Sequence, residues 1–116
     1  MIYHDIDFYK DCLSNFEKTH KNIKCLRFSQ DIDLCYFRLL IEFIDASPIW
    51  GIIDTMYPSE EQVIKILNKM YEELGSNTVY VLLHSDNNNM GLIKEENEKE
   101  LSTNYELIIT LKEKNE

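Results

Sequence analysis

Two segments of the sequence place apolar residues at the spacing of an amphipathic helix. Residues 5–20 carry them at steps of three and four, as Ile6, Tyr9, Leu13 and Phe16. Residues 60–74 repeat this period, and Ser59 with Gln62 has the spacing of a capping box at a helix start. Gly75 follows the last apolar residue, where helices commonly end on glycine. We therefore expect helices over residues 5–20 and 60–74.

Other segments have the apolar runs or the alternation that strands show. Residues 23–29 predict a short strand, and the continuous apolar run over 78–84 predicts a buried central one. Residues 34–44 fit either a strand or a helix, and their aromatic and β-branched content favours the strand. The segments 23–29 and 34–44 are then expected to pair antiparallel around an Asp-rich turn. A short further strand over 50–54 fits the apolar connection that follows.

The C-terminal part of the chain is polar except for one alternating segment. Residues 85–91 predict a loop, and the charged residues 92–101 predict a short helix. Residues 105–111 predict a strand with one wet face, because apolar and polar positions alternate along them. The apolar face carries Tyr105, Leu107, Ile109 and Leu111, and the other face carries Glu106, Ile108, Thr110 and Lys112.

Taken in order, these segments predict an α+β fold. Their order is α-β-β-α-β-(α)-β, which lacks the strict βαβα alternation of doubly wound proteins. We expect a single α+β domain over residues 1–116. It would hold an antiparallel or mixed sheet of about four strands, packed by two main helices.

The chain is strongly acidic, and this narrows the kinds of partner it can have. Its formal net charge is −9, from 12 Lys+Arg against 21 Asp+Glu. Nucleic acids and anionic membranes are both bound through basic side chains, so we expect neither as a partner. A basic protein would instead be attracted. Acidity also promotes solubility without any partner, and this simpler interpretation stands beside the first.

Two features of the sequence bear on the compartment. No apolar run approaches the ~18 residues of a membrane span, and the longest, 39–44, contains Glu42. The first residues have neither the basic nor the apolar region of a secretory signal. Cys12, Cys25 and Cys35 are odd in number and match no zinc-binding spacing, so we expect buried free thiols. These features predict a cytoplasmic protein.

Motifs of the common enzyme and cofactor classes are missing from the sequence. It has three glycines and no phosphate-binding loop, and neither GxSxG nor HExxH occurs. A calcium loop beginning at Asp86 would place Met90 and Asn97 where the motif needs Asp or Asn and then Glu. We therefore expect no cofactor and no metal. His84 ends a predicted strand as a candidate acid or base, but adjacent residues such as His84 and Ser85 point in different directions and make no triad.

Carboxylates and aromatic side chains together predict a protein-binding surface. Helix capping explains the acidic pair at 60–61, whereas the acidic residues between 86 and 100 have no such explanation. Trp50 and Tyr57 are candidate anchors, because aromatic side chains are enriched among the residues that dominate binding energy. The predicted protein-binding residues are Asp31, Asp33, Trp50, Tyr57, Asp86, Glu95, Glu96 and Glu98.

These observations predict a non-enzymatic, acidic protein-binding domain. A single alanine with abundant Lys, Asn and Ile suggests an A/T-rich coding sequence, as in low-GC bacteria and mobile elements. The sharpest hypothesis is a bacterial immunity protein that neutralises a cognate toxin, basic and of nuclease type, by direct binding. The alternatives are a nucleic-acid-mimic inhibitor of phage or mobile-element origin, and a small enzyme or ligand-binding domain that uses His84. The oligomeric state stays open.

Overall fold

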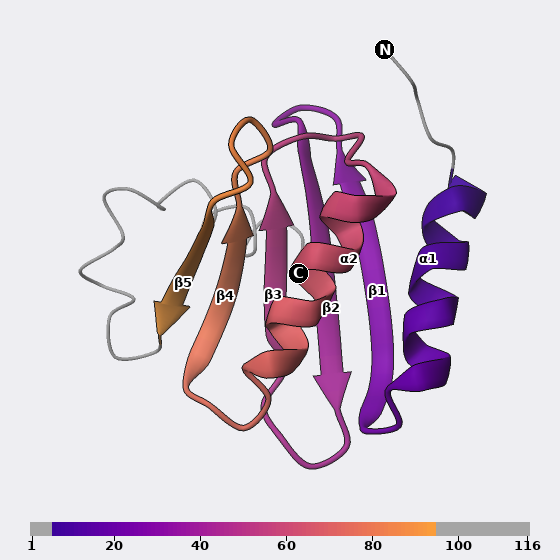
Figure 1. Ribbon diagram of the computed structural model, residues 1–116, viewed down its shortest axis with the longest axis vertical. Helices are drawn as coiled ribbons and strands as arrows, with labels where there is room; N and C mark the ends of the chain where they lie inside the picture. Colours follow the sequence, from indigo (N-terminus) through magenta and orange to yellow (C-terminus); the bar gives the residue numbers. More distant parts are fainter. Residues whose placement is uncertain (1–5, 95–116) are drawn as a thin grey trace.

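The computed structural model describes residues 6–94, which form two helices and a five-stranded mixed sheet (Figure 1). This is an α+β fold, so the predicted class is confirmed. In chain order the elements are α1 (Ile6–Thr19), β1 (Ile23–Asp31), β2 (Tyr36–Phe43), β3 (Ile49–Ile53), α2 (Glu60–Glu72), β4 (Thr78–Leu83) and β5 (Met90–Lys94).

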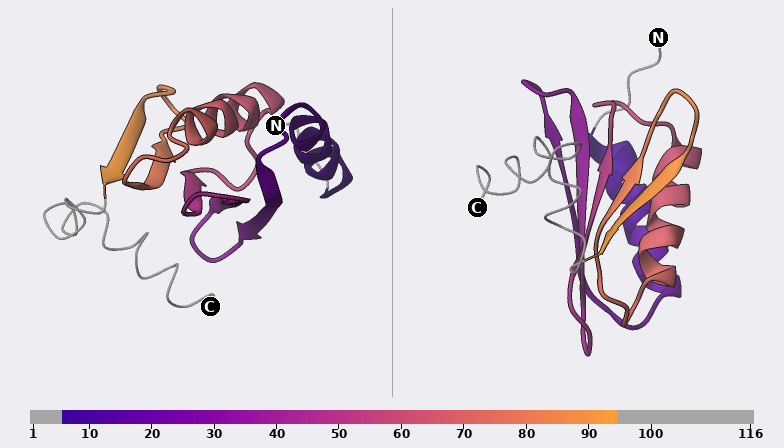
Figure 2. Two further views of the ribbon diagram at one scale, coloured as in Figure 1. Left: turned by 90° about the horizontal axis from the view of Figure 1, so that it is seen from below. Right: turned by 90° about the vertical axis from the view of Figure 1, so that its left-hand side faces the viewer.

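The topology of the sheet combines antiparallel pairs with one parallel pair. The strands lie in the order β1-β2-β3-β4-β5, and all neighbours run antiparallel except β3 and β4. A parallel pair needs a crossover connection, which α2 provides. Figure 2 shows that α1 and α2 pack on the same face of the sheet. The connections that follow β1, β3 and β4 consequently lie at one end of the sheet (Figure 1).

Helix α2 begins where the sequence predicts and ends at Glu72, two residues before the predicted end. The Ser59 hydroxyl accepts a hydrogen bond from the Gln62 amide at 3.2 Å, and the Gln62 side chain accepts one from the Ser59 amide at 3.0 Å. This capping box satisfies amides that the first turn leaves without helical partners. Gly75 follows the helix with a φ of +80°, a left-handed conformation that glycine adopts without strain.

The main core lies between the two helices and the sheet. Tyr9 of α1 is fully buried there, and its hydroxyl donates to the Pro58 carbonyl at 2.9 Å, which ties α1 to the start of α2. Burial raises the pKa of Tyr9 to about 12. Gly51 of β3 allows α2 to approach closely, because a Cβ there would lie 2.5 Å from Met70 Sδ and 3.2 Å from Ile66 Cδ1.

The sheet has five strands, where the sequence predicts about four. Three of the four predicted strands, over 23–29, 34–44 and 78–84, lie within the described residues, and β3, the short strand expected near 50–54, is one addition to them. The other is β5, so the predicted helix over 92–101 is wrong at residues 92–94. Ile93 is fully buried in β5, and the edge of β4 offers backbone hydrogen bonds that a helix would leave unused. The rest of that segment and the predicted strand over 105–111 lie outside the described residues.

The cysteines are less buried than the sequence predicts. Cys12 is buried on the inner side of α1, as expected. Cys25 is half-buried in β1, which is an edge strand of the sheet. Cys35 is exposed in the turn after β1, where its φ of 57° is left-handed. The expectation of three buried thiols is therefore wrong for two of them, because both lie at the periphery of the sheet.

Candidate functional site

Three connections meet at one end of the sheet. They are the β1–β2 turn (31–36), the β3–α2 connection (54–59) and the β4–β5 loop (84–89), and Figure 1 shows them at the top of the sheet. Both helices also begin at this end. We call the residues 31–36, 54–59 and 84–89 the loop edge.

The loop edge is acidic. Its three segments contain no Lys or Arg, and their carboxylates belong to Asp31, Asp33, Asp54 and Asp86. One basic side chain reaches this edge from α2, where Lys65 Nζ donates to the Asn88 carbonyl at 2.7 Å. The Lys65 ammonium offsets only part of the negative charge of these four carboxylates, and the acidic first turn of α2, Glu60 and Glu61, adds to that charge.

Asp54 and His84 form the centre of the loop edge. They follow the parallel strands β3 and β4, whose last residues, Ile53 and Leu83, are aligned, so the two side chains come together. His84 Nδ1 lies 3.4 Å from Asp54 Oδ2, and the Ser85 amide donates to Asp54 Oδ1 at 2.5 Å. These contacts bind the β3–α2 connection to the β4–β5 loop.

The electrostatics of this pair follow from its hydrogen bonds. Burial acts to raise the pKa of Asp54, but hydrogen bonds from Ser85 and His84 outweigh it and hold that pKa below its usual value. Burial also raises the pKa of Tyr36 at the start of β2, and the negative charge of Asp54 adds to the shift. Asp54 is therefore an ionised carboxylate at neutral pH.

The β4–β5 loop is fastened to helix α2. The Gln62 side chain donates from Nε2 to the Ser85 carbonyl at 3.2 Å and to Asn88 Oδ1 at 3.3 Å. Within the loop, the Asn88 amide donates to the His84 carbonyl at 2.7 Å, and Asn88 has a left-handed φ of 56°. Asp86 is exposed on this loop, so its carboxylate is presented to solvent from a held backbone.

The β1–β2 turn presents an apolar side chain between two carboxylates. Ile32 is 75% exposed, and Asp31 and Asp33 flank it. Asp31 also shapes the turn, because its Oδ1 accepts a hydrogen bond from the Leu34 amide at 3.0 Å. Gln30 Nε2 donates to the carbonyl of Met56 at 2.9 Å and so links this turn to the β3–α2 connection.

The structure brings together half of the predicted protein-binding residues. The loop edge contains four of them, Asp31, Asp33, Tyr57 and Asp86. Trp50 lies apart, in the middle of β3, where the Arg38 guanidinium stands 5.3 Å from the centre of its ring. Trp50 therefore belongs to the short strand that the sequence allows over residues 50–54, and not to the β3–α2 connection that contains Tyr57. The other three, Glu95, Glu96 and Glu98, lie outside the described residues.

Sequence reasoning missed two residues of the loop edge and the glutamine of α2 that contacts it. Asp54 and Gln62 were not among the predicted site residues, and neither was Ile32. The sequence does contain a signal for Asp54. Asp54 comes directly after one apolar strand segment, His84 comes directly after the next, and a helix lies between the two segments. Side chains after the carboxyl ends of two neighbouring parallel strands meet at the same edge of a sheet. That signal requires β3 to be recognised as a full strand.

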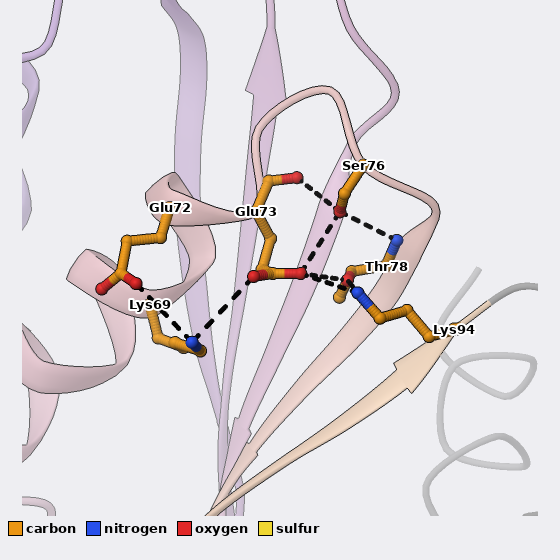
Figure 3. Close-up of polar contacts among 6 residues, drawn as sticks. All are labelled: Lys69, Glu72, Glu73, Ser76, Thr78 and Lys94. Atoms are coloured by element: carbon orange, nitrogen blue, oxygen red, sulfur yellow. Dashed lines mark hydrogen bonds and ion pairs between the residues drawn. The ribbon is translucent and has the colours of Figure 1, made fainter.

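A second polar cluster lies at the opposite end of the sheet (Figure 3). Glu73 Oε1 accepts hydrogen bonds from Thr78 Oγ1 at 2.5 Å and from Lys94 Nζ at 3.0 Å, and Lys69 Nζ lies 4.0 Å from Oε2. The hydrogen bonds from Thr78 and Lys94 hold the pKa of Glu73 below its usual value. We call Lys69, Glu73, Thr78 and Lys94 the Glu73 cluster. The carboxylate of Glu73 has its partners within the protein, so this cluster stabilises the fold.

The carboxylates of the loop edge can bind positively charged groups, and the same edge contains one histidine, His84. Among residues 6–94, no group of three or more His, Cys, Asp or Glu side chains is arranged to hold a metal ion. The exposed carboxylates can accept hydrogen bonds from Lys or Arg. His84 is 46% exposed at its side chain and holds Asp54 with one ring nitrogen.

Comparisons with known proteins do not assign a function, so the geometry of the loop edge is the basis for one. No protein-family model matches the chain, and neither a curated protein nor a solved structure shows significant similarity to it. A fold class by itself does not determine function, so the assignment has to come from the site.

Proposed function

We propose that this protein is a non-enzymatic acidic domain that binds a basic protein partner through the loop edge. The observation that carries the proposal is the meeting of three connections with four carboxylates and no Lys or Arg within them. Such a concentration of one charge attracts an oppositely charged partner and accelerates its association. Asp31 and Asp54 also hold the connections in place, whereas Asp33 and Asp86 are exposed at the surface, so folding does not account for the charge of these last two.

The loop edge also has the anatomy of an interface. Ile32 supplies an exposed apolar side chain inside a polar surround, which matches the apolar centre and polar rim of protein interfaces. The contacts made by Gln30 and Gln62 hold the connections in place before binding. A surface that is already ordered loses less entropy when the partner docks.

The finer proposal concerns the partner and the compartment. We infer that the partner is a toxin of nuclease type, whose nucleic-acid-binding surface is basic, and that the chain is its bacterial immunity protein. Cys12, Cys25 and Cys35 are all free thiols, which supports a reducing compartment such as the cytoplasm. Neither helix within residues 6–94 has the length and apolar character needed to span a membrane.

The experiment compares two triple variants that remove equal charge from opposite parts of the molecule. The edge variant is Asp31→Asn/Asp33→Asn/Asp86→Asn, and the control variant is Glu17→Gln/Asp45→Asn/Glu72→Gln, at exposed positions away from the loop edge. Both, with the unmodified protein, are used to capture partners from extracts of the source cell. The captured protein is then purified, and its dissociation constant is measured over a range of salt concentrations.

We expect a basic protein whose affinity falls at least tenfold with the edge variant and changes little with the control. Equal losses with both variants would show that overall charge, rather than the loop edge, attracts the partner. Capture of no basic protein would refute the proposal. Displacement of the partner by DNA would show that the loop edge occupies the partner's nucleic-acid-binding surface, which both a nuclease inhibitor and a nucleic-acid mimic would do.

A second candidate function is a small enzyme or ligand-binding domain that uses His84. The observation that favours it is the contact of His84 with Asp54 at the carboxyl ends of two parallel strands, where ligands commonly bind. A carboxylate fixes the orientation of a histidine that acts as an acid or base. Replacing His84 by Gln separates the two functions, since it abolishes turnover in an enzyme but leaves the affinity for a basic protein nearly unchanged.

A further inference from the structure

Three large apolar side chains of the described chain are exposed, and they lie in different places. Ile6 begins α1, Ile44 follows β2, and Ile32 lies in the β1–β2 turn of the loop edge. Ile32 is the most exposed of the three at 75%, against 53% for Ile6 and 68% for Ile44. Turns mostly carry Gly, Pro, Asn, Asp or Ser, so an isoleucine at this position needs an explanation. Folding does not provide one, because residues 6–94 leave most of the Ile32 side chain uncovered.

The turn that carries Ile32 is held in one shape before any partner binds. Asp31 is paired with Tyr36 across the ends of β1 and β2, and its Oδ1 accepts a hydrogen bond from the Leu34 amide at 3.0 Å. The Ile32 carbonyl accepts a hydrogen bond from Cys35 Sγ at 3.8 Å. Isoleucine is also branched at Cβ, which restricts its side-chain rotamers. An ordered turn with a stiff side chain loses little entropy when that side chain is buried in a complex.

Two carboxylates flank this apolar side chain. Asp31 and Asp33 are its neighbours in the sequence, Asp33 is exposed, and residues 31–36 contain no Lys or Arg. A protein surface that covers Ile32 must therefore also come close to both carboxylates. Taking a carboxylate out of water costs free energy unless a cationic group pairs with it. The surface that covers Ile32 consequently has to present Lys or Arg side chains around an apolar centre.

We propose that Ile32 is the anchor of the loop edge, and that it enters an apolar pocket of the partner whose rim carries Lys or Arg opposite Asp31 and Asp33. This inference rests on the proposed function, because it names the surface that the basic partner offers to the loop edge. The carboxylates attract any basic protein. Only a partner with the apolar pocket also takes up Ile32, so this side chain selects among basic proteins.

The carboxylates and the anchor act on different rate constants of binding. Exposed charges at an interface mainly set the rate of association and its dependence on salt. An apolar side chain that is buried in the complex mainly sets the rate of dissociation, because its contacts have to break before the two proteins separate. Substitutions at Ile32 and at Asp33 should therefore change different rate constants of the same complex.

The test measures both rates with the basic protein that the unmodified chain captures, and Ile44→Ala is the matched control. Ile44 is 68% exposed but lies in the β2–β3 connection, at the opposite end of the sheet (Figure 1). We expect Ile32→Ala to accelerate dissociation by about tenfold or more and to leave the association rate and its salt dependence nearly unchanged. Ile44→Ala should change neither rate. Polylysine, which has positive charge but no apolar pocket, should bind Ile32→Ala as tightly as it binds the unmodified protein.

The outcomes separate this inference from the proposed function. If Ile32→Ala dissociates at the unmodified rate while the edge variant still binds more weakly, the inference is overturned and the proposed function stands. If the edge variant also binds normally, or no basic protein is captured, both fail. Equal acceleration by Ile44→Ala would overturn the inference as well. So would a lower thermal midpoint of free Ile32→Ala, because Ile32 would then be covered already by the chain itself or by a second copy.

Discussion

The two ends of the sheet use negative charge in opposite ways. At the Glu73 cluster, a carboxylate that is 15% exposed receives hydrogen bonds from Thr78 and Lys94. At the loop edge, Asp33 and Asp86 are exposed, and the segments around them contain no Lys or Arg. The comparison shows two roles for the acidic residues of this chain. Some stabilise the fold through hydrogen bonds and ion pairs, and others give an exposed surface a negative charge.

The cause of this difference lies in where the lysines fall along the chain. Lys69 is in the last turn of α2 and Lys94 ends β5, so the topology delivers both to the same end of the sheet as Glu73. At the loop edge, the partners of Asp31 and Asp54 include the backbone amides of Leu34 and Ser85. A backbone amide satisfies a carboxylate without neutralising its charge, so the negative charge remains available to a partner.

The largest effect is expected from Glu73→Gln. The substitution keeps the shape of the side chain but removes the charge that Thr78 and Lys94 stabilise. We expect the free energy of unfolding to fall by about 1.5–3 kcal/mol, as for hydrogen bonds to a charged group. Urea denaturation at neutral pH measures it. The matched control is Glu72→Gln, whose side chain is 65% exposed and whose loss should change stability by less than about 0.5 kcal/mol.

The stability difference between the unmodified protein and Glu73→Gln should depend on pH. The pKa of Glu73 in the folded chain lies below its usual value of 4.5, so folding favours the ionised form. Its contribution is thus fully present above about pH 5 and is lost as the pH falls through the lower folded pKa. Denaturation curves at a series of pH values should show the difference shrinking in acid. A difference that grows in acid would mean that the protonated carboxyl is the stabilising form.

A smaller loss of stability is expected from Asp54→Ala at the loop edge. The variant removes the acceptor of the Ser85 amide and the partner of His84. Because the Asp54 side chain is 35% exposed, water replaces part of what is lost, and we expect about 1 kcal/mol. Urea denaturation gives the value, and faster deuterium exchange at the Ser85 amide locates it. Unchanged exchange there would show that the contacts from α2, made by Gln62 and Lys65, hold the β4–β5 loop without Asp54.

Much of the fold could be predicted because its signals are local. The capping box at Ser59 and the glycine at 75 define α2 from neighbouring residues alone. The prediction fails at 92–94 because residues 90–94 become a strand only when β4 offers a free edge, which is a contact far along the chain. The parallel pairing of β3 and β4 is non-local in the same sense.

The candidate site could be predicted only in its composition. Asp31, Asp33 and Asp86 stand out as acidic loop residues, but their meeting depends on a topology that the sequence pattern does not reveal. Asp54 pairs with His84 only because β3 and β4 are parallel and aligned. The separation of Trp50 from Tyr57 has a simpler reason. Once Ile49 starts a strand facing the helices, alternation puts residue 50 on the other side of the sheet.

The smallest effect on stability, and the sharpest test of the comparison, is expected from Asp33→Asn/Asp86→Asn. If these carboxylates only charge a surface, their removal relieves mutual repulsion instead of breaking contacts. At an ionic strength of about 0.01 M, where the screening length is about 30 Å, the variant should therefore be as stable as the unmodified protein or slightly more stable. At about 1 M the screening length is near 3 Å, and any gain should vanish. Urea denaturation at both salt concentrations makes the measurement. A loss of stability comparable to that of Glu73→Gln would mean that both ends of the sheet use their carboxylates for folding, and the loop edge would then have no charge left to offer a partner.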